Sequence, residues 1–187
     1  MRFSSLGAKE TVNRSLTKSV VEGVIFAHSE PLSMETLERL LPVVPRSLLE
    51  EILQELEEEY NARSRGFTLT QVGGGYQFRT LPEVAPWILS LRSIRPTRLS
   101  RAALETLSVV AYNQPITKSR IEQIRGVESS SALKSLLERD LVTAAGKVDG
   151  PGRAILYATT PRFLEVFGLK DLSELPPLPE IEVIVDE

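Results

Sequence analysis

Residues that could carry out chemistry are few in this chain of 187 residues. His28 is the only histidine and cysteine is absent, so disulfides, thiol nucleophiles and thiolate metal sites are excluded. His28 follows Val24 on the apolar face of an expected helix, a position typical of a core or boundary histidine rather than a catalytic base. A zinc site would need carboxylate partners, and none is suitably spaced. The sequence therefore predicts no metal and no cofactor.

Two glycine clusters and a run of serines are also better explained by structural roles than by catalytic or binding roles. A phosphate-binding loop must open a helix, so that its N–H groups point at the anion. Both Gly73-Gly74-Gly75 and Gly150-Pro151-Gly152 instead precede strand-like residues, which favours turns. Ser129-Ser130-Ser131 lack a neighbouring base and stand where a helix should start, so we expect helix caps. These residues predict that the protein is not an enzyme; an unrecognised hydrolase is the remote alternative.

Composition and charge indicate a soluble cytoplasmic protein. Hydrophobic residues make up 42% and charged residues 25% of the chain, as in ordinary globular proteins. No apolar stretch approaches the ~20 residues of a membrane span, and residues 1–14 lack the apolar core of a secretory signal. The net charge of -3 comes without a dense positive segment, so gripping DNA phosphates is not the expected main task.

An internal repeat organises the chain. The segment AHSEPLSMETLERL, which begins at Ala27, aligns without a gap with AYNQPITKSRIEQI, which begins at Ala111. Two copies are too few for a solenoid and predict tandem domains. In each copy a helix should end before the proline, and Ser33 or Thr117 should cap a short second helix.

Apolar spacing and glycine-rich turns complete the pattern. The residues expected on buried helix faces are Val21, Val24, Ile25, Leu37, Leu40, Leu48, Leu49, Ile52, Leu53 and Leu56 in the first copy, and Leu104, Leu107, Ala111, Ile121, Ile124, Leu133, Leu136 and Leu137 in the second, with Leu141 just beyond. Strand-like runs flank each turn, at 67–72 and 76–80, then at 141–144 and 154–159. Three helices followed by a hairpin predict a winged helix.

The predicted fold is mainly α with small β-hairpins, arranged as two tandem winged-helix domains. We expect a flexible extension over 1–15, an N-terminal domain over 16–81, a connecting helix or linker over 82–98, a C-terminal domain over 99–170 and a Pro-rich acidic tail over 171–187. Trp87, Leu91 and Ile94 would share one face of the connecting helix. The stretch Leu175–Pro179 should be extended and polyproline-like.

Winged helices often bind DNA through their third helix, but this sequence argues against it in the first domain. Its third helix carries Glu50, Glu51, Glu55, Glu57, Glu58 and Glu59, and like charges near phosphates cost about 1 kcal/mol each even when water screens them. The second domain carries scattered bases that we interpret as a solvated face, so direct DNA contact should be weak or absent. A tandem winged-helix transcription regulator remains the main alternative.

Surplus aromatic residues favour a protein partner instead. Trp87, Tyr112, Tyr157 and Phe163 each suit a core, but domains of this size bury only a modest core. Two weakly charged domains with neutral or acidic third helices, together with these aromatics, indicate protein binding.

Four runs of the second domain form a recognisable pattern: Ala111–Val127, Leu133–Leu141, Gly150-Pro151-Gly152-Arg153 and Leu156–Leu164. Together they give the domain a resemblance to the ScpB family of bacterial SMC complexes. The resemblance is dense over about 99–178 and looser over 16–80, where Glu-Pro-Leu-Ser and Gly-Gly-Tyr-Gln-Phe are similar. Ser131 stands where the family pattern has glycine.

This resemblance implies a cytoplasmic accessory subunit, associated with the nucleoid, that dimerises mainly through its N-terminal domain. It would bind the central segment of the kleisin ScpA mainly through its C-terminal domain, and SMC through ScpA, to condense and segregate chromosomes. The ATPase would belong to SMC.

On this basis we expect a kleisin-binding surface on the second domain. Basic side chains would meet acids of the kleisin: Arg120, Arg125, Lys134 and Arg153. Aromatic side chains would anchor its apolar residues: Tyr112, Tyr157 and Phe163. For the dimer interface we expect the outer surface of the first domain with Trp87 and Leu91.

Overall fold

The structure is a computed structural model that describes residues 13–62, 65–92, 98–149 and 152–178. The chain divides into two compact units, Met1–Arg98 and Leu99–Glu187, here called the first unit and the second unit. The second unit begins at the residue where the predicted C-terminal domain begins.

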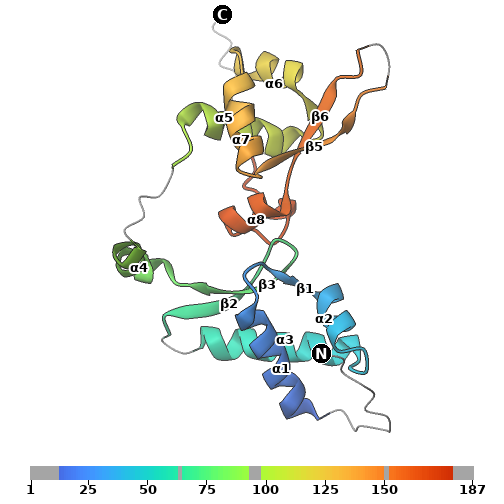
Figure 1. The fold of residues 1–187 in the computed structure, drawn as a ribbon, viewed down its shortest axis with the longest axis vertical. Coiled ribbons are helices and arrows are strands. Elements are labelled where there is room, and N and C mark those ends of the chain that lie inside the picture. Colours follow the sequence, from blue (N-terminus) through green and yellow to red (C-terminus); the bar gives the residue numbers. More distant parts are fainter. Residues whose placement is uncertain (1–12, 63–64, 93–97, 150–151, 179–187) are drawn as a thin grey trace, which may run out of the picture. The chain divides into compact units, whose positions relative to one another are not determined.

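The first unit combines helices with a small antiparallel sheet. Its elements are α1 (Arg14–Ala27), β1 (Leu32–Ser33), α2 (Met34–Leu40), α3 (Arg46–Asn61), β2 (Phe67–Val72), β3 (Gly75–Thr80), η1 (Pro82–Val84) and α4 (Ala85–Arg92). The strand order is β1-β3-β2. Because α1 contacts β3 and α3 contacts β2, both helices pack against the sheet (Figure 1).

The second unit repeats this order. Its elements are α5 (Arg101–Asn113), β4 (Ile116–Thr117), α6 (Lys118–Arg125), α7 (Ser130–Glu138), β5 (Val142–Lys147), β6 (Ile155–Thr159), α8 (Pro161–Phe167) and η2 (Leu172–Glu174). The strand order β4-β6-β5 matches that of the first unit. Leu32 pairs with Tyr76 and Ile116 pairs with Tyr157, so the two repeated segments enter equivalent sheets. The prediction of two tandem winged helices is confirmed.

Local signals place the helix starts. The Ser33 hydroxyl accepts a hydrogen bond from the Thr36 N–H at 3.2 Å, and the Thr117 hydroxyl accepts one from the Arg120 N–H at 3.3 Å. Both predicted caps are therefore present. The wing turn at Gly73 and Gly74 has φ of 58° and 75°, a region that glycine enters without steric cost.

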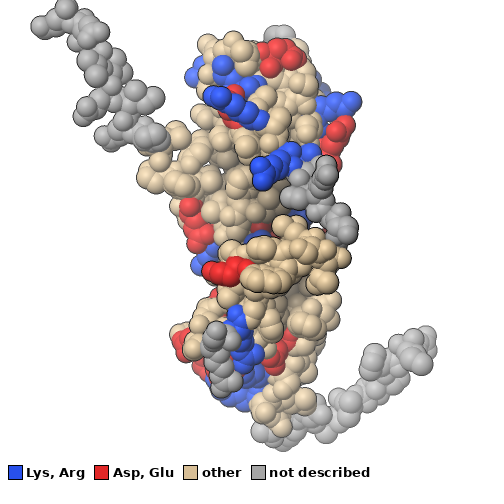
Figure 2. Space-filling model, turned by 90° about the vertical axis from the view of Figure 1, so that its left-hand side faces the viewer, with Lys and Arg blue, Asp and Glu red and all other residues tan. Residues whose placement is uncertain are grey.

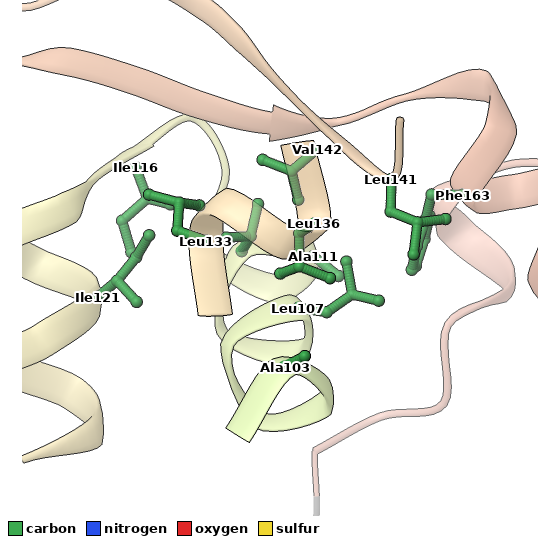
Figure 3. Close-up of a cluster of buried hydrophobic side chains, with 11 residues drawn as sticks. Ala103, Leu107, Ala111, Ile116, Ile121, Leu133, Leu136, Leu141, Val142 and Phe163 are labelled. Atoms are coloured by element: carbon green, nitrogen blue, oxygen red, sulfur yellow. The ribbon is translucent and has the colours of Figure 1, made fainter. Parts of the chain in front are cut away.

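Each unit has its own apolar core. In the first unit the core is formed by Val21, Ile25, Leu32, Leu37, Val44, Leu49, Ile52, Leu53, Leu56 and Leu69. In the second it is formed by Ala103, Leu107, Val110, Ala111, Ile116, Ile121, Leu133, Leu136, Leu141, Val142 and Phe163 (Figure 3). The helices expected to carry these faces supply most of both cores.

Several residues predicted to be buried are exposed. Leu40 and Ile124 are 52% and 43% exposed, because α2 and α6 are short and bury only the turn that carries Leu37 or Ile121. Leu104 and Leu137 are also exposed, since each lies at the margin of its helix's buried face.

His28 is neither a core nor a boundary residue. It is exposed at the C-terminal cap of α1, where the helix has ended and its apolar face no longer continues. Its Nδ1 lies 2.8 Å from the Glu30 carbonyl oxygen.

Some predicted boundaries shift. α1 begins at Arg14, inside the expected extension 1–15, because the Asn13 side chain accepts from the Leu16 N–H and caps the helix. β5 runs on to Lys147, beyond the expected end at 144. Ile94, Gly150, Pro151 and the segment 179–187 lie outside the described residues.

Candidate partner-binding surfaces

An apolar groove in the second unit lies between α5 and α8. It encloses a cavity of about 140 Å³ whose lining includes Leu104, Leu107 and Tyr112 from α5, Phe163 and Phe167 from α8, and Leu175 from the tail. The rings of Phe163 and Phe167 lie 4.8 Å apart between centroids. We call this the α5–α8 groove. Its lining is mostly apolar, so it suits an apolar side chain of a partner.

A second hollow lies where β4 leads into α6. It measures about 290 Å³ and is lined by Asn113, Pro115, Ile116, Thr117, Arg120 and Leu156. The Arg120 side chain is exposed, and its Nη1 donates to the Gln123 side chain at 2.6 Å. We call this the β4–α6 hollow. It combines an accessible cation with a mainly polar lining at an edge strand of the sheet.

The corner behind this hollow is held by Gln114, which precedes Pro115 across a cis peptide bond. The Gln114 Oε1 accepts from both the N–H and the hydroxyl of Thr159, at 2.7 and 2.9 Å. These bonds tie the end of α5 to β6. Tyr157 stands on the same strand, opposite Ile116, and is half-buried against the core.

The third hollow belongs to the wing. It measures about 370 Å³ and is lined by Ala144, Gly146, Lys147, Arg153 and Ile155. Lys147 and Arg153 are exposed, and neither forms an ion pair with another described residue. Arg153 precedes β6 and lines this hollow, whereas Arg120 belongs to α6 and lines the β4–α6 hollow, so the predicted basic residues do not share one hollow.

Arg125 was predicted to meet the kleisin, but its side chain is only 6% exposed. Its Nη1 donates to the Ser129 hydroxyl at 2.8 Å and its Nη2 to Glu105 at 3.1 Å, while its Nε has no partner among the described residues. This burial argues against the predicted contact, because the guanidinium is used inside the unit to join α5, α6 and the start of α7. Ser129 is correspondingly buried and, against expectation, its side chain does not cap α7.

This buried arginine also acts on its acidic partner. The hydrogen bond from Arg125, together with one from Arg101, holds the pKa of Glu105 below its ordinary value. Glu105 therefore stays ionised at neutral pH and keeps the link between α5 and α6.

The remaining predicted contact residues fall in different settings. Phe163 is 3% exposed and lies beside Leu141 in the core (Figure 3), so it supports the α5–α8 groove from below rather than projecting as an anchor. Lys134 is exposed on α7 and approaches Glu138 at 3.8 Å. Tyr112 is half-buried, and its hydroxyl donates to the Pro176 carbonyl at 2.6 Å.

In the first unit the predicted dimer residues are exposed. Trp87 and Leu91 of α4 are 69% and 85% exposed. Further apolar surface comes from α1, where Phe26 is 73% exposed and its ring lies 6.3 Å from that of Phe78. Exposed apolar side chains that adjoin one another, such as Trp87 and Leu91 one turn apart on α4, are typical of interaction surfaces.

The acids of α3 have an internal role that sequence inspection missed. Glu55 binds Arg14 at 2.9 Å and Lys18 at 2.8 Å, and Lys18 also binds Glu59 at 2.6 Å. The hydrogen bond from Lys18 is the main cause that lowers the pKa of Glu55. Part of the acidic face of α3 therefore fastens α1 to α3.

The charge distribution agrees with a protein-binding surface more than with a DNA-gripping one. On the face shown in Figure 2, Lys and Arg side chains lie in small groups among acidic and uncharged residues. Within the described residues, no cluster of His, Asp or Glu could hold a metal ion. The same part of the chain contains no helix long and apolar enough to cross a membrane.

Two winged-helix units in one chain, with exposed apolar and basic groups on each, define a tandem winged-helix protein. Residues 19–178 match the family described as Segregation and condensation complex subunit ScpB, and the chain belongs to that family. Segregation and condensation protein B of Syntrophotalea carbinolica is 46% identical over 91% of this chain and 86% of its own. Its counterpart from Desulforamulus reducens is 48% identical over 91% of this chain and 93% of its own.

A solved structure of a dimer of ScpB N-terminal domain complexed with ScpA peptide is also similar. It is 28% identical and covers 41% of this chain and 95% of that one, with a TM-score of 0.38.

Proposed function

We propose that this protein is a non-catalytic subunit of an SMC–ScpA–ScpB complex that binds the central segment of the kleisin ScpA through its second unit. It would act in the cytoplasm, at the nucleoid, and ATP hydrolysis would belong to SMC. Family membership supports the complex. The observation that carries the site is the β4–α6 hollow, a mainly polar recess whose lining includes the exposed Arg120 side chain and the half-buried Leu156.

An extended acidic and apolar segment fits this recess. Its carboxylate would pair with Arg120, and an apolar side chain would lie on Leu156, whereas Ile116 is 4% exposed and belongs to the core beneath the hollow. β4 is an edge strand, the element to which extended peptides commonly add. Tyr157 pairs with Ile116 on the neighbouring strand, and Tyr112 lines the α5–α8 groove. Arg153, Lys134 and Tyr112 would contribute only if the segment continues beyond the hollow toward the wing, α7 or that groove.

Charge reversal at Arg120 tests the site. We expect Arg120→Glu to raise the Kd for the central ScpA segment at least about tenfold, equivalent to about 1.4 kcal/mol, measured by isothermal titration calorimetry. Arg39→Glu is the matched control, because Arg39 is exposed on α2, the equivalent helix of the first unit. An unchanged Kd for folded Arg120→Glu would remove the hollow from the site. A loss confined to Arg39→Glu would move kleisin binding to the first unit.

We further propose that the protein is a homodimer whose interface lies on the first unit and includes Trp87 and Leu91. The support is the exposure of both side chains on α4, since burying two large apolar groups stabilises association. Light scattering should show a monomer for the double variant Trp87→Ser/Leu91→Ser and a dimer for Val148→Ser, which changes an exposed apolar residue of the second unit. A dimer that survives the double variant but not Phe26→Ser would place the interface on α1.

The main alternative is a transcription regulator that binds DNA with its wings, and the exposed Lys147 and Arg153 are the observation in its favour. Nanomolar, sequence-selective binding to a DNA duplex at physiological salt would support it. Weak binding that disappears with added salt, without sequence preference, would not.

A further inference from the structure

The segment after α8 turns back onto the helices of the second unit. We call residues 172–178 the tail segment; it starts with η2 and continues in extended conformation, with φ of -61° and ψ of 133° at Leu175. Leu175 packs against the core cluster and lines the α5–α8 groove. The Pro176 carbonyl accepts the hydrogen bond from Tyr112. Leu175 therefore fills part of the space between α5 and α8 and lines the cavity of about 140 Å³ that remains open.

Hydrogen bonds within residues 170–175 direct the tail segment toward the α5–α8 groove. Asp171 accepts from the Ser173 N–H at 2.8 Å, and the Lys170 N–H donates to Glu174 at 2.6 Å. The Leu175 N–H donates to the Leu172 carbonyl at 3.2 Å. This short turn reverses the chain after Gly168, whose positive φ of 70° ends α8. Leu175 thereby lines the same groove as Leu104 and Phe167.

The tail segment covers the groove only in part. Leu104 and Phe167, both in its lining, remain 44% and 46% exposed. Beyond Leu175 the side chains of the tail segment bury little surface, because Pro176 and Pro177 are exposed and Leu178 is 63% exposed. One leucine and one hydroxyl hydrogen bond form the contact with α5. A contact of this size can open and close, and apolar surface beside it stays free for an incoming segment.

We propose that the tail segment is a displaceable intramolecular ligand of the α5–α8 groove, and that the ScpA central segment takes its place when it reaches Tyr112. This proposal rests on the proposed function. The tail segment indicates the chemistry that the groove accepts, namely an extended segment with a leucine followed by prolines. Because the docked tail and the kleisin exclude each other, the apparent affinity for ScpA falls with the fraction of molecules whose groove is open.

The test uses the full chain with Leu175→Ser, which removes the side chain that enters the groove. Leu178→Ser is the matched control, since it makes the same change in the same segment where the side chain is exposed. Hydrogen exchange over residues 169–178 reports whether the tail is docked, and calorimetry gives the Kd for the ScpA central segment. We expect Leu175→Ser to speed exchange and lower the Kd by about 3- to 10-fold, with neither change in Leu178→Ser.

A second variant guards against an indirect effect of Leu175→Ser. Tyr112→Phe keeps the ring in the groove and removes only the hydrogen bond to Pro176; it should shift exchange and Kd in the same direction by a smaller factor. A Kd that stays unchanged or rises when Leu175→Ser speeds exchange would overturn the proposal. Unchanged exchange in that variant would also overturn it, since Leu175 would then not hold the tail.

A synthetic peptide of residues 170–178 separates this proposal from the proposed function. If the wild-type chain fails to bind ScpA at all, kleisin binding is refuted. Binding of the peptide then tests the α5–α8 groove on its own. The peptide should bind the Leu175→Ser variant more tightly than the wild-type chain, because the variant's own tail no longer competes for the groove. Equal or absent peptide binding to both proteins would refute the intramolecular ligand as well.

Discussion

The two wings share a topology but differ in what covers them. In the first unit Phe67 and Phe78 of the hairpin meet Tyr60 of α3, with centroid distances of 5.5 Å for Tyr60–Phe67 and 4.7 Å for Tyr60–Phe78. In the second unit the matching strand carries Ala144, Ala145 and Gly146, which stay exposed. Aromatic side chains are large enough to bridge from the hairpin to the helices, whereas small residues leave the second wing uncovered.

The polar links between helices also differ between the two units: the first unit has exposed ion pairs, and the second has a buried arginine. The first unit joins α1 to α3 by ion pairs at the surface, where Arg14 is 52% exposed. The second unit buries a single arginine between α5, α6 and α7. These differences in wing packing and in polar links show that two copies of one fold can keep the same helix caps and turns while their surfaces diverge. The covered first unit retains outward apolar groups suited to self-association, and the second retains hollows suited to an extended partner.

The largest expected effect comes from the separate cores. Leu53→Ala should lower the unfolding free energy of the first unit by about 2–5 kcal/mol, and Leu136→Ala that of the second by a similar amount, since each leaves a cavity in a fully buried site. Hydrogen exchange resolves the two units. Leu137→Ala, at the exposed neighbour of Leu136, should stay within about 0.5 kcal/mol. Destabilisation of both units by either core variant would show that they do not fold independently.

The next largest effect concerns a position where the two sheets differ. Gly75 pairs with Ser33, whereas its counterpart Leu156 pairs with Thr117 and lines the β4–α6 hollow. A Cβ at Gly75 would lie 2.7 Å from the Leu32 carbonyl carbon, too close for backbone to yield easily.

Gly75→Ala should therefore destabilise the first unit by on the order of 2–3 kcal/mol, measured by denaturant unfolding. Gly23→Ala is the control, because nothing lies within 4 Å of an added Cβ there. It should instead stabilise α1 by about 0.5–1 kcal/mol. Equal responses of the two variants would show that β1 can move away from β3, and that the tight approach does not distinguish the sheets.

These differences determine which features of the structure can be predicted from the sequence. The repeat, the caps at Ser33 and Thr117 and the glycine turn of the first wing follow from local chemistry and helical spacing, so the winged helices were predictable. The α5–α8 groove was not, because Leu104, Phe167 and Leu175 are distant in the chain and only the fold brings them together. A leucine beside consecutive prolines was the available signal for the tail segment.

Arg125 shows why contact residues were harder to predict than elements. In the sequence it is one more base on a short helix, equivalent to Arg120. The structure exposes Arg120 and buries Arg125, since the partners of Arg125 include Glu105, 20 residues earlier. Phe163 was similarly ambiguous, because an aromatic residue suits a core or an interface equally well until its neighbours are known.

A moderate effect should distinguish the polar links of the two units. Arg125→Met should destabilise the second unit by about 1–2 kcal/mol, because Ser129 and Glu105 lose a buried donor. Arg14→Met removes an exposed partner of Glu55 and should cost no more than about 0.5–1 kcal/mol in the first unit. Urea denaturation of each variant gives the comparison. An effect of Arg14→Met as large as that of Arg125→Met would mean that surface and buried links stabilise the units equally.

The smallest effect is a pH dependence that both units share. The pKa values of Glu105 and Glu55 lie below the ordinary 4.5 because of hydrogen bonds from Arg125 and Lys18. A carboxylate with a lowered pKa in the folded state stabilises that state above its unfolded pKa, and the contribution disappears as pH falls through the folded pKa. Both units should therefore lose stability below about pH 4.5.

Each unit provides the control for the other in this measurement. Glu105→Gln should flatten the acid loss of stability in the second unit only, and Glu55→Gln in the first only, as followed by hydrogen exchange between pH 3 and 6. The cations and the carboxylates differ in opposite directions: Arg125 is 6% exposed against 20% for Lys18, whereas Glu105 is 47% exposed against 36% for Glu55. If burial of the cation governs the screening of the pair, the Glu105 variant should flatten its curve more. Equal flattening would show that burial of Arg125 does not strengthen its ion pair with Glu105. The two units would then differ only in the packing of their wings and in their surface hollows.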